Sequence, residues 1–72
     1  MDAREIRGMT TDDIRRKIDE TYEELFNLRF QFVMGQLEDH NRLKALRRDV
    51  ARMKTILRER ELAQAMQEGE AA

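Results

Sequence analysis

A chain of 72 residues with a net charge of −1 and no cysteine forms at most one small domain, without disulfides or thiolate metal sites to reinforce it. No apolar run approaches the ~20 residues that span a bilayer, and no signal-peptide core follows the first residue, so we expect a cytoplasmic protein with no membrane partner. Proline is absent and 40% of the residues are charged, which suits long solvated helices.

The amino-terminal part contains a short turn and then the start of a long helix. Ile6 is its one notable apolar residue, and we expect a single helical turn that ends near Gly8. Thr10 is placed to cap the backbone N–H of Asp13, because a threonine hydroxyl accepts this hydrogen bond at a helix start. We therefore predict that the first long helix begins at about Thr11.

This helix is expected over about residues 11–34 and carries two sets of apolar side chains. One set repeats at spacings of 4, 3, 4, 3 and 4, which is an a/d heptad stripe that packs into the core. The stripe consists of Ile14, Ile18, Thr21, Leu25, Leu28 and Phe32. The other set turns away from the stripe and is interpreted as a partner surface, because exposed aromatic side chains beside an arginine commonly mark one. The partner surface consists of Tyr22, Phe26, Phe30 and Val33, with Tyr22 alternatively widening the core.

A glycine and a short turn follow the first long helix. Gly35 ends the helix in the left-handed conformation that glycine adopts without steric cost. The turn covers about residues 35–39, and Asp39 is placed to cap the next helix. Because so short a connection forces two helices to run antiparallel, we predict an all-α fold. It is a long, coiled-coil-like antiparallel two-helix hairpin with a short N-terminal helical turn.

The second helix is expected over about residues 40–62. Its core stripe consists of Leu43, Leu46, Val50, Met53 and Leu57, at spacings of 3, 4, 3 and 4. Beyond Leu62 the apolar pattern gives way to Ala, Gln, Glu and Gly. We therefore expect a single domain over residues 1–62 and a flexible acidic tail over residues 63–72.

Positive charge is concentrated in the second helix. Residues 42–60 contain eight basic and two acidic side chains, a local charge of +6. Arginine outnumbers lysine eleven to three in the chain, and its guanidinium fork matches phosphate oxygens. We expect these residues to bind RNA, since nothing indicates the recognition helix of a DNA-reading helix-turn-helix. The residues expected to take part are Arg42, Lys44, Arg47, Arg48, Arg52, Lys54, Thr55 and Arg58.

Catalytic chemistry has no support in the sequence. His40 is the only histidine, no cysteine accompanies it, and the carboxylates fall on the solvated side of a helix. A two-helix chain also lacks a third layer that would enclose a pocket. We therefore predict no enzyme, cofactor, metal or small-molecule substrate. The alternative to an RNA-binding protein is a coiled-coil protein–protein interaction module, in which the heptads dimerise and the basic side is incidental.

Three motifs resemble a known family. They are ELFNLRFQ at residues 24–31, GQL at residues 35–37 and RRDVARMKT at residues 47–55. They are similar to the small helical-hairpin protein numbered twenty-nine of the bacterial large ribosomal subunit, in unbroken register over about residues 3–61. The resemblance implies a structural protein that binds large-subunit ribosomal RNA near the exit of the peptide tunnel. It also implies two protein partners: the neighbouring large-subunit protein twenty-three and a ribosome-associated chaperone or targeting factor.

The resemblance also assigns individual positions. The family's basic signature corresponds to Arg47, Arg48, Arg52, Lys54 and Thr55. Its polar, RNA-binding positions near the hairpin tip correspond to Asn27, Arg29, Gln31 and Gln36.

Overall fold

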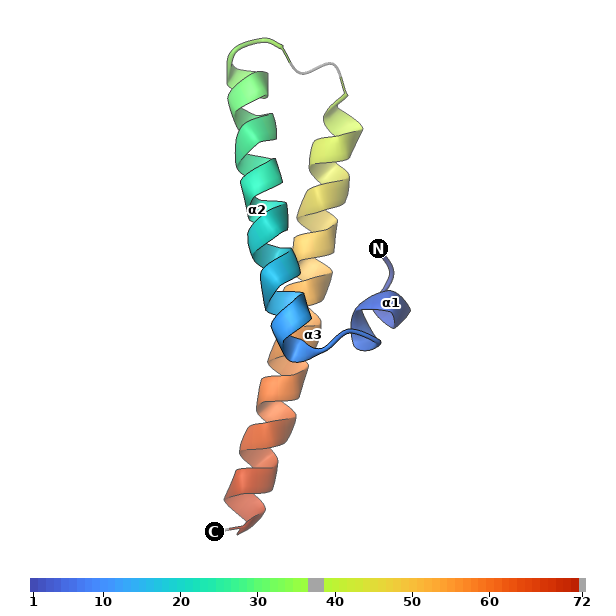
Figure 1. Cartoon of the computed structure of the whole chain (residues 1–72), viewed down its shortest axis with the longest axis vertical. Coiled ribbons are helices and arrows are strands. Elements are labelled where there is room, and N and C mark those ends of the chain that lie inside the picture. The colour runs from blue at the N-terminus through green and yellow to red at the C-terminus, as the bar shows by residue number, and fades with distance from the viewer. Residues whose placement is uncertain (37–38, 72) are drawn as a thin grey trace.

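Three helices make up the computed structural model, which describes residues 1–36 and 39–71 (Figure 1). α1 spans Ala3–Arg7, α2 spans Thr11–Val33 and α3 spans His40–Ala71. α2 and α3 lie side by side and antiparallel, and the described part of the chain contains no strand. With extents of 55 × 20 × 15 Å, the molecule is a rod whose length comes mainly from α3. The predicted all-α hairpin with a short N-terminal helical turn is confirmed.

The start of α2 is defined by its capping residue. The Thr10 hydroxyl accepts a hydrogen bond of 3.1 Å from the backbone N–H of Asp13. Asp12 and Asp13 add negative charge to the first turn, where the helix dipole is positive. The predicted cap at Thr10 is therefore confirmed.

α2 ends in a Schellman motif with Gly35 just beyond its last turn. The N–H of Gln36 donates to the carbonyl of Gln31 at 2.8 Å, and the N–H of Gly35 donates to the carbonyl of Phe32 at 3.0 Å. This pair of hydrogen bonds requires a left-handed residue, and the φ of Gly35 is +71°. Glycine adopts this conformation without the steric cost that a Cβ would bring, so the predicted stop is confirmed.

The start of α3 lies beside the end of α2. The carboxylate of Asp39 accepts a hydrogen bond of 2.9 Å from the backbone N–H two residues later, as its predicted capping role requires. The rings of Phe32 and His40 meet edge to face with 5.3 Å between centroids, which links the two helices next to the turn. Of the turn predicted over residues 35–39, residues 37–38 lie outside the described residues.

The hydrophobic core lies where the three helices meet. Its buried side chains are Ile6, Ile14, Ile18, Leu25, Leu46, Val50, Met53 and Ile56. All but Ile6 and Ile56 belong to the two predicted stripes. Thr21, also a stripe residue, is buried as well, and its hydroxyl donates to the carbonyl of Lys17 at 2.7 Å. A polar side chain is tolerated in this core because its hydrogen bond is made within the helix.

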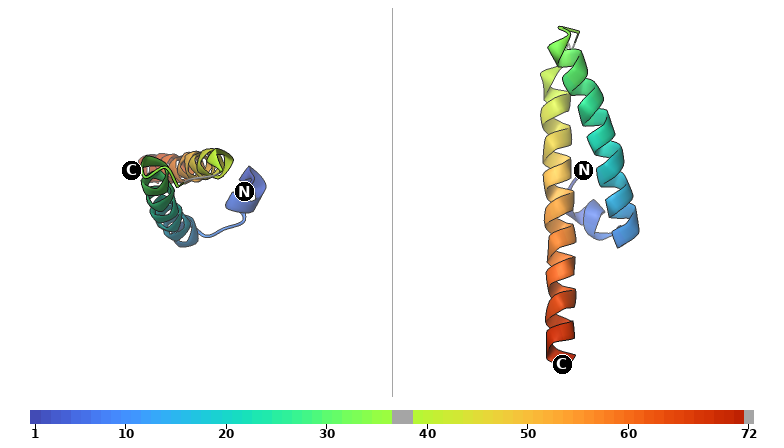
Figure 2. Two further views of the ribbon diagram at one scale, coloured as in Figure 1. Left: turned by 90° about the horizontal axis from the view of Figure 1, so that it is seen from above. Right: turned by 90° about the vertical axis from the view of Figure 1, so that its left-hand side faces the viewer.

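The core becomes thinner toward the turn and shifts around α3 near α1. Leu28 and Leu43 are half-buried, and Phe32, predicted as the last stripe residue of α2, is 53% exposed. On α3 the stripe residue Leu57 is half-buried and packs against the core, whereas its neighbour Ile56, which the stripe does not include, is buried. The reason is that α1 packs on α3 at a different position around it from α2 (Figure 2). A third helix therefore covers Ile56, which a two-helix seam would leave exposed.

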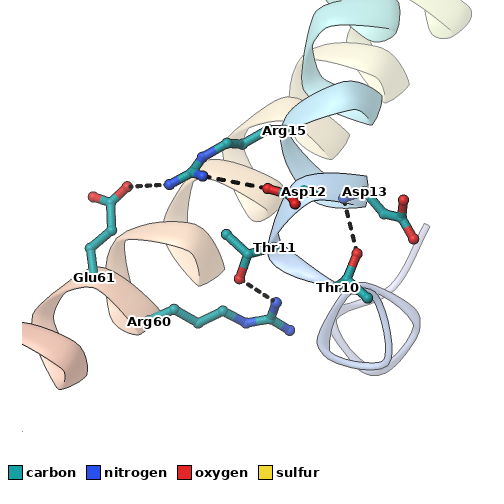
Figure 3. A network of polar contacts seen from close by, with 7 residues as sticks. All are labelled: Thr10, Thr11, Asp12, Asp13, Arg15, Arg60 and Glu61. Carbon is teal, nitrogen blue, oxygen red and sulfur yellow. Dashed lines mark hydrogen bonds and ion pairs between the residues drawn. The ribbon is translucent and has the colours of Figure 1, made fainter.

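A polar network joins α3 to α1 and to the start of α2. The Arg60 guanidinium donates to the carbonyl of Arg7 at 3.1 Å and to the hydroxyl of Thr11 at 3.2 Å. Arg15 lies 3.8 Å from Glu61, so the α2 side of this junction carries an ion pair as well (Figure 3). One arginine of α3 thus bonds to α1 and α2 together.

α3 continues to Ala71, beyond the end predicted at Leu62. It extends past the start of α2 into solvent, and its described side chains there are exposed (Figure 1). The segment stays helical because Ala, Gln, Met and Glu are strong helix formers and no proline interrupts them. Where the sequence led us to expect a flexible acidic tail over residues 63–72, the structure has a helix, apart from the last residue, which lies outside the described part.

Candidate nucleic-acid interface

Five cations of α3 are exposed, and their side chains make neither an ion pair nor a hydrogen bond with the described residues. We call them the cation face; they are Lys44, Arg47, Arg48, Lys54 and Arg58. At 3.6 residues per turn they fall within an arc of about 120°, on the side of α3 away from Ile56 and α1. Like charges placed this close on one helix repel each other, which an anionic ligand would relieve. The cation face is therefore a surface of concentrated positive charge, and that a polyanion binds it stays a prediction.

Arg42 was expected to bind RNA, but its side chain is engaged by α2. Its Nε and Nη2 atoms both donate to one carboxylate oxygen of Glu24, at 3.2 and 2.8 Å. The two side chains are 55% and 46% exposed, so solvent screens the pair and it contributes at most about 1 kcal/mol. Arg42 nevertheless offers less free positive charge than the sequence suggests.

Two further residues of the predicted RNA-binding set make contacts within the protein. The Arg52 guanidinium donates to the carbonyl of Met1 at 2.8 Å and so holds the segment that leads into α1. The Thr55 hydroxyl donates to the carbonyl of Ala51, one turn earlier, at 2.8 Å. Both side chains remain exposed, so they stay candidates for RNA contacts. Arg52 has a role in the fold as well.

A groove of about 270 Å³ runs between α2 and α3 beside the cation face. Its lining consists of Tyr22, Leu25, Arg29, Arg47, Val50, Ala51 and Lys54. The two buried aliphatic side chains form an apolar floor, while Arg29 from α2 and Arg47 from α3 supply positive charge. The ammonium of Lys54 lies 4.8 Å from the ring centroid of Tyr22, a cation–π contact between the helices. Charge and aromatic surface thus meet in one place.

Ala51 lies between this groove and a second one. The second groove, of about 230 Å³, separates α1 from α3, and Ala51 also lines it together with Arg52 and Thr55. A small side chain here leaves the backbone of α3 open to close approach by a ligand.

The partner surface predicted on α2 is exposed in the structure. The exposed fractions are 43% for Tyr22, 72% for Phe26, 61% for Phe30 and 79% for Val33. Large apolar side chains this open favour a complex, since burial stabilises by about 25 cal/mol per Å² of apolar area. That a partner covers them stays a prediction.

The polar positions near the tip do not share one side of α2. Asn27 and Gln31 are each two residues from Arg29, which turns them about 160° away from it around the helix. The N–H of Gln36 is used in the helix stop at Gly35. The structure therefore brings Arg29 to the groove and the cation face, and leaves Asn27 and Gln31 on another side.

Some cross-helix contacts follow from folding the chain at its turn. Tyr22 pairs with Lys54 and Arg15 with Glu61, and both pairs are equidistant from position 38. Pairing residues symmetrically about the predicted turn would have found these contacts. No such signal exists for Arg60, whose partners include a carbonyl of α1, and sequence reasoning missed its role.

The side chains that line the groove between α2 and α3 and form the cation face are cationic, aromatic and aliphatic groups. In the described ranges, no three His, Cys, Asp or Glu side chains are grouped so that they could hold a metal ion. The only histidine, His40, packs against Phe32. Likewise, none of the helices over residues 1–36 and 39–71 has the length and apolarity needed to cross a membrane.

Known proteins resemble this chain over almost all of its hairpin. A family model described as Ribosomal L29 protein matches residues 4–60. The chain is 61% identical to the large ribosomal subunit protein uL29 of Natranaerobius thermophilus over 62 residues, which are 86% of this chain and 95% of that protein. Identity to the protein of the same name from Geobacillus stearothermophilus is 60% over 63 residues, 88% and 96% of the two chains. For that of Staphylococcus aureus it is 52% over 64 residues, 89% and 93%.

Proposed function

The chain belongs to the ribosomal L29 protein family, and from this premise we propose that it binds large-subunit ribosomal RNA through the cation face of α3. Membership confirms the resemblance that three sequence motifs predicted. It also makes the chain a structural protein of the large ribosomal subunit rather than an enzyme. Its location is therefore the ribosome, which in bacteria is cytoplasmic.

The observation that carries the proposal is the cation face itself. Its five cations have no carboxylate partner among the described residues, although the chain as a whole carries −1. A solvated surface usually mixes both signs of charge, so segregation on one side of one helix needs another explanation. RNA supplies a row of phosphates, and each contact releases counterions that favour binding. The arginines add bidentate hydrogen bonds that hold the phosphates in a defined geometry.

We further propose the position of the hairpin in the subunit. It lies near the exit of the peptide tunnel beside large-subunit protein twenty-three, and a ribosome-associated chaperone or targeting factor docks close by. The support for this placement is the family resemblance and not a contact within this chain. The exposed partner surface of α2 fits such a crowded site, because it needs RNA or a neighbouring protein to cover it.

The alternative of a coiled-coil interaction module is less well supported. It requires a heptad stripe that is free to pair with another chain. The stripe residues buried within the hairpin are Ile14, Ile18, Leu25, Leu46, Val50 and Met53. Because the core already uses these side chains, dimerisation through them would require the hairpin to open.

Co-sedimentation of the full chain with protein-depleted large subunits, at several salt concentrations, tests RNA binding. The double variant Arg48→Ala/Arg58→Ala removes two cations whose side chains make no hydrogen bond or ion pair with the described residues. It should weaken binding and lower the slope of log affinity against log salt by about 1.5. Helicity should be unchanged, because alanine is the better helix former.

The matched control is Arg16→Ala/Lys17→Ala, which removes the same charge from α2, away from the cation face. This variant should retain both the affinity and the salt slope. Equal losses in the two double variants would mean that RNA responds to net charge alone. Unchanged binding in both would refute the proposal.

A further inference from the structure

Three hollows follow one another along the exposed side of α2. The first is the groove between α2 and α3, which Tyr22 borders. The second, of about 270 Å³, lies between Tyr22 and Phe26, and the third, of about 330 Å³, lies between Phe26 and Phe30. Arg29 lines all three. Aromatic rings and hollows therefore alternate along the helix.

We propose that Tyr22, Phe26 and Phe30 form an aromatic track on which unpaired nucleotides of RNA stack. The inference rests on the proposed RNA binding and specifies the form of RNA that this side of the hairpin accepts. It accepts a single strand or a loop, whose bases are free to stack, in preference to a duplex.

The spacing of the rings suits successive bases. Residues four apart lie on the same side of a helix, about 6 Å from one another along its axis. The three side chains are 43%, 72% and 61% exposed, so their rings are accessible to a ligand. Aromatic side chains in a row beside positive charge are the means by which proteins hold single strands, because every base has a face that stacks.

The charges around the track are placed for the phosphates. Arg29 lines every hollow, and Arg47 and Lys54 of α3 line the first. No carboxylate is among the described residues that line the three hollows. A strand whose bases face the rings would therefore have its backbone beside cations.

The contact between Lys54 and Tyr22 can be exchanged for contacts with RNA, which uncovers the Tyr22 ring for a base. In the unbound chain its ammonium lies 4.8 Å from the centroid of the Tyr22 ring. A base that stacks on Tyr22 displaces the ammonium, which then binds a neighbouring phosphate. Lys54 has a favourable partner before and after the exchange, so little is lost when the ring is uncovered.

A duplex fits this surface less well than a single strand does. Its bases are already stacked, and the major groove of A-form RNA is too narrow for side chains to reach them. Phenylalanine rings facing the ribose and phosphate of a duplex would gain no stacking partner. The cation face alone would then carry the binding.

Intrinsic fluorescence gives a direct test, because Tyr22 is the only tyrosine and the chain contains no tryptophan. The full chain is titrated with a short single-stranded RNA and, separately, with the duplex of that strand and its complement. We expect the single strand to bind more tightly and to change the Tyr22 emission, while the duplex leaves the emission nearly unchanged. Equal emission changes for both forms would overturn the inference.

Variants assign the effect to the rings. Phe26→Leu/Phe30→Leu keeps apolar side chains and should reduce single-strand affinity about tenfold for each ring, while duplex affinity stays the same. The control is Phe32→Leu, because Phe32 is also exposed but packs beside His40 and lines none of the three hollows. Circular dichroism of all variants excludes unfolding as the cause.

The outcomes separate the inference from the function on which it rests. If Arg48→Ala/Arg58→Ala weakens RNA binding but the double phenylalanine variant does not, RNA binding stands and the aromatic track is wrong. If that phenylalanine variant binds RNA normally yet enters large subunits poorly, the surface meets a protein and the inference is likewise overturned. If neither the arginine nor the phenylalanine variant affects binding, the proposed function fails as well.

Discussion

The two ends of the hairpin differ in how many helices share the core. At the end that carries α1, Ile6, Ile14 and Met53 are completely buried, and Arg60 bonds to α1 and α2. Toward the turn only two helices face each other, Leu28 is half-buried and large aromatic side chains are open to solvent. Stability is therefore concentrated at the α1 end, whereas the turn end supplies surface for partners. One short helix makes this difference, because it adds a third layer at one end only.

The largest expected effect is the loss of a side chain from the α1 end. Ile14→Ala should destabilise the free chain by about 3–4 kcal/mol, because it leaves a cavity in a fully buried site. Leu28→Ala, in the thinner half of the core, should cost only about 1 kcal/mol. Urea unfolding followed by circular dichroism measures both variants. Equal losses of stability in the two variants would show that the core is uniform along the hairpin and that its two ends do not differ in stability.

A smaller effect is expected from Arg60→Met, which keeps the apolar stem and removes the hydrogen bonds to Arg7 and Thr11. Hydrogen bonds of a charged donor contribute about 1.5–3 kcal/mol, so α1 should separate from α3 before the hairpin unfolds. Hydrogen exchange of the Ile6 amide, which donates to the carbonyl of Asp2, reports this separation. Arg58→Met, at an exposed position, should leave that exchange rate as it is. A fully protected Ile6 amide in the Arg60 variant would show that apolar packing alone holds α1.

The smallest effect on the free chain is expected at the turn end. Phe30 is 61% exposed, so Phe30→Ala should change the free energy of unfolding by less than about 0.5 kcal/mol. The same variant should enter large subunits less efficiently, since the ring is proposed to contact a partner there. Measurements of unfolding and of incorporation into large subunits together decide whether Phe30 belongs to the core or to a partner surface. A loss of stability as large as that of Leu28→Ala would place the ring in the core.

Much of this fold could be predicted from the sequence, because it depends on local interactions. The caps at Thr10 and Asp39 and the stop at Gly35 depend on side chains and backbone within a few residues, so residue type alone indicated them. Heptad spacing identified most of the buried side chains for the same reason. The predicted end of α3 was too early, because the loss of the apolar pattern was given more weight than the helix propensity of the Ala, Gln, Met and Glu residues that follow Leu62.

The candidate site was predicted in part. The charge excess and the exposure of Phe26 and Phe30 follow from composition and helical period, and the structure shows both. The pairing of Lys54 with Tyr22, by contrast, depends on the register between two helices. The hydrogen bonds from Arg42 to Glu24, 18 positions away along the chain, depend on this register as well. Neither contact is visible in a helical wheel of one element.

By itself, the sequence determined the helices, the starts of α2 and α3, the stop of α2, the hairpin and the segregation of charge, because interactions within one or two turns decide these features. Only the tertiary structure decided where α1 packs. Arg52 bonds to Met1, just before α1, at a separation of 51 positions, and Arg60 bonds to Arg7 of α1 at a separation of 53 positions. No periodicity reports on so distant a pair. The burial of Ile56, which lies outside the predicted stripe, has the same origin, since a helix buries whichever side a distant segment covers.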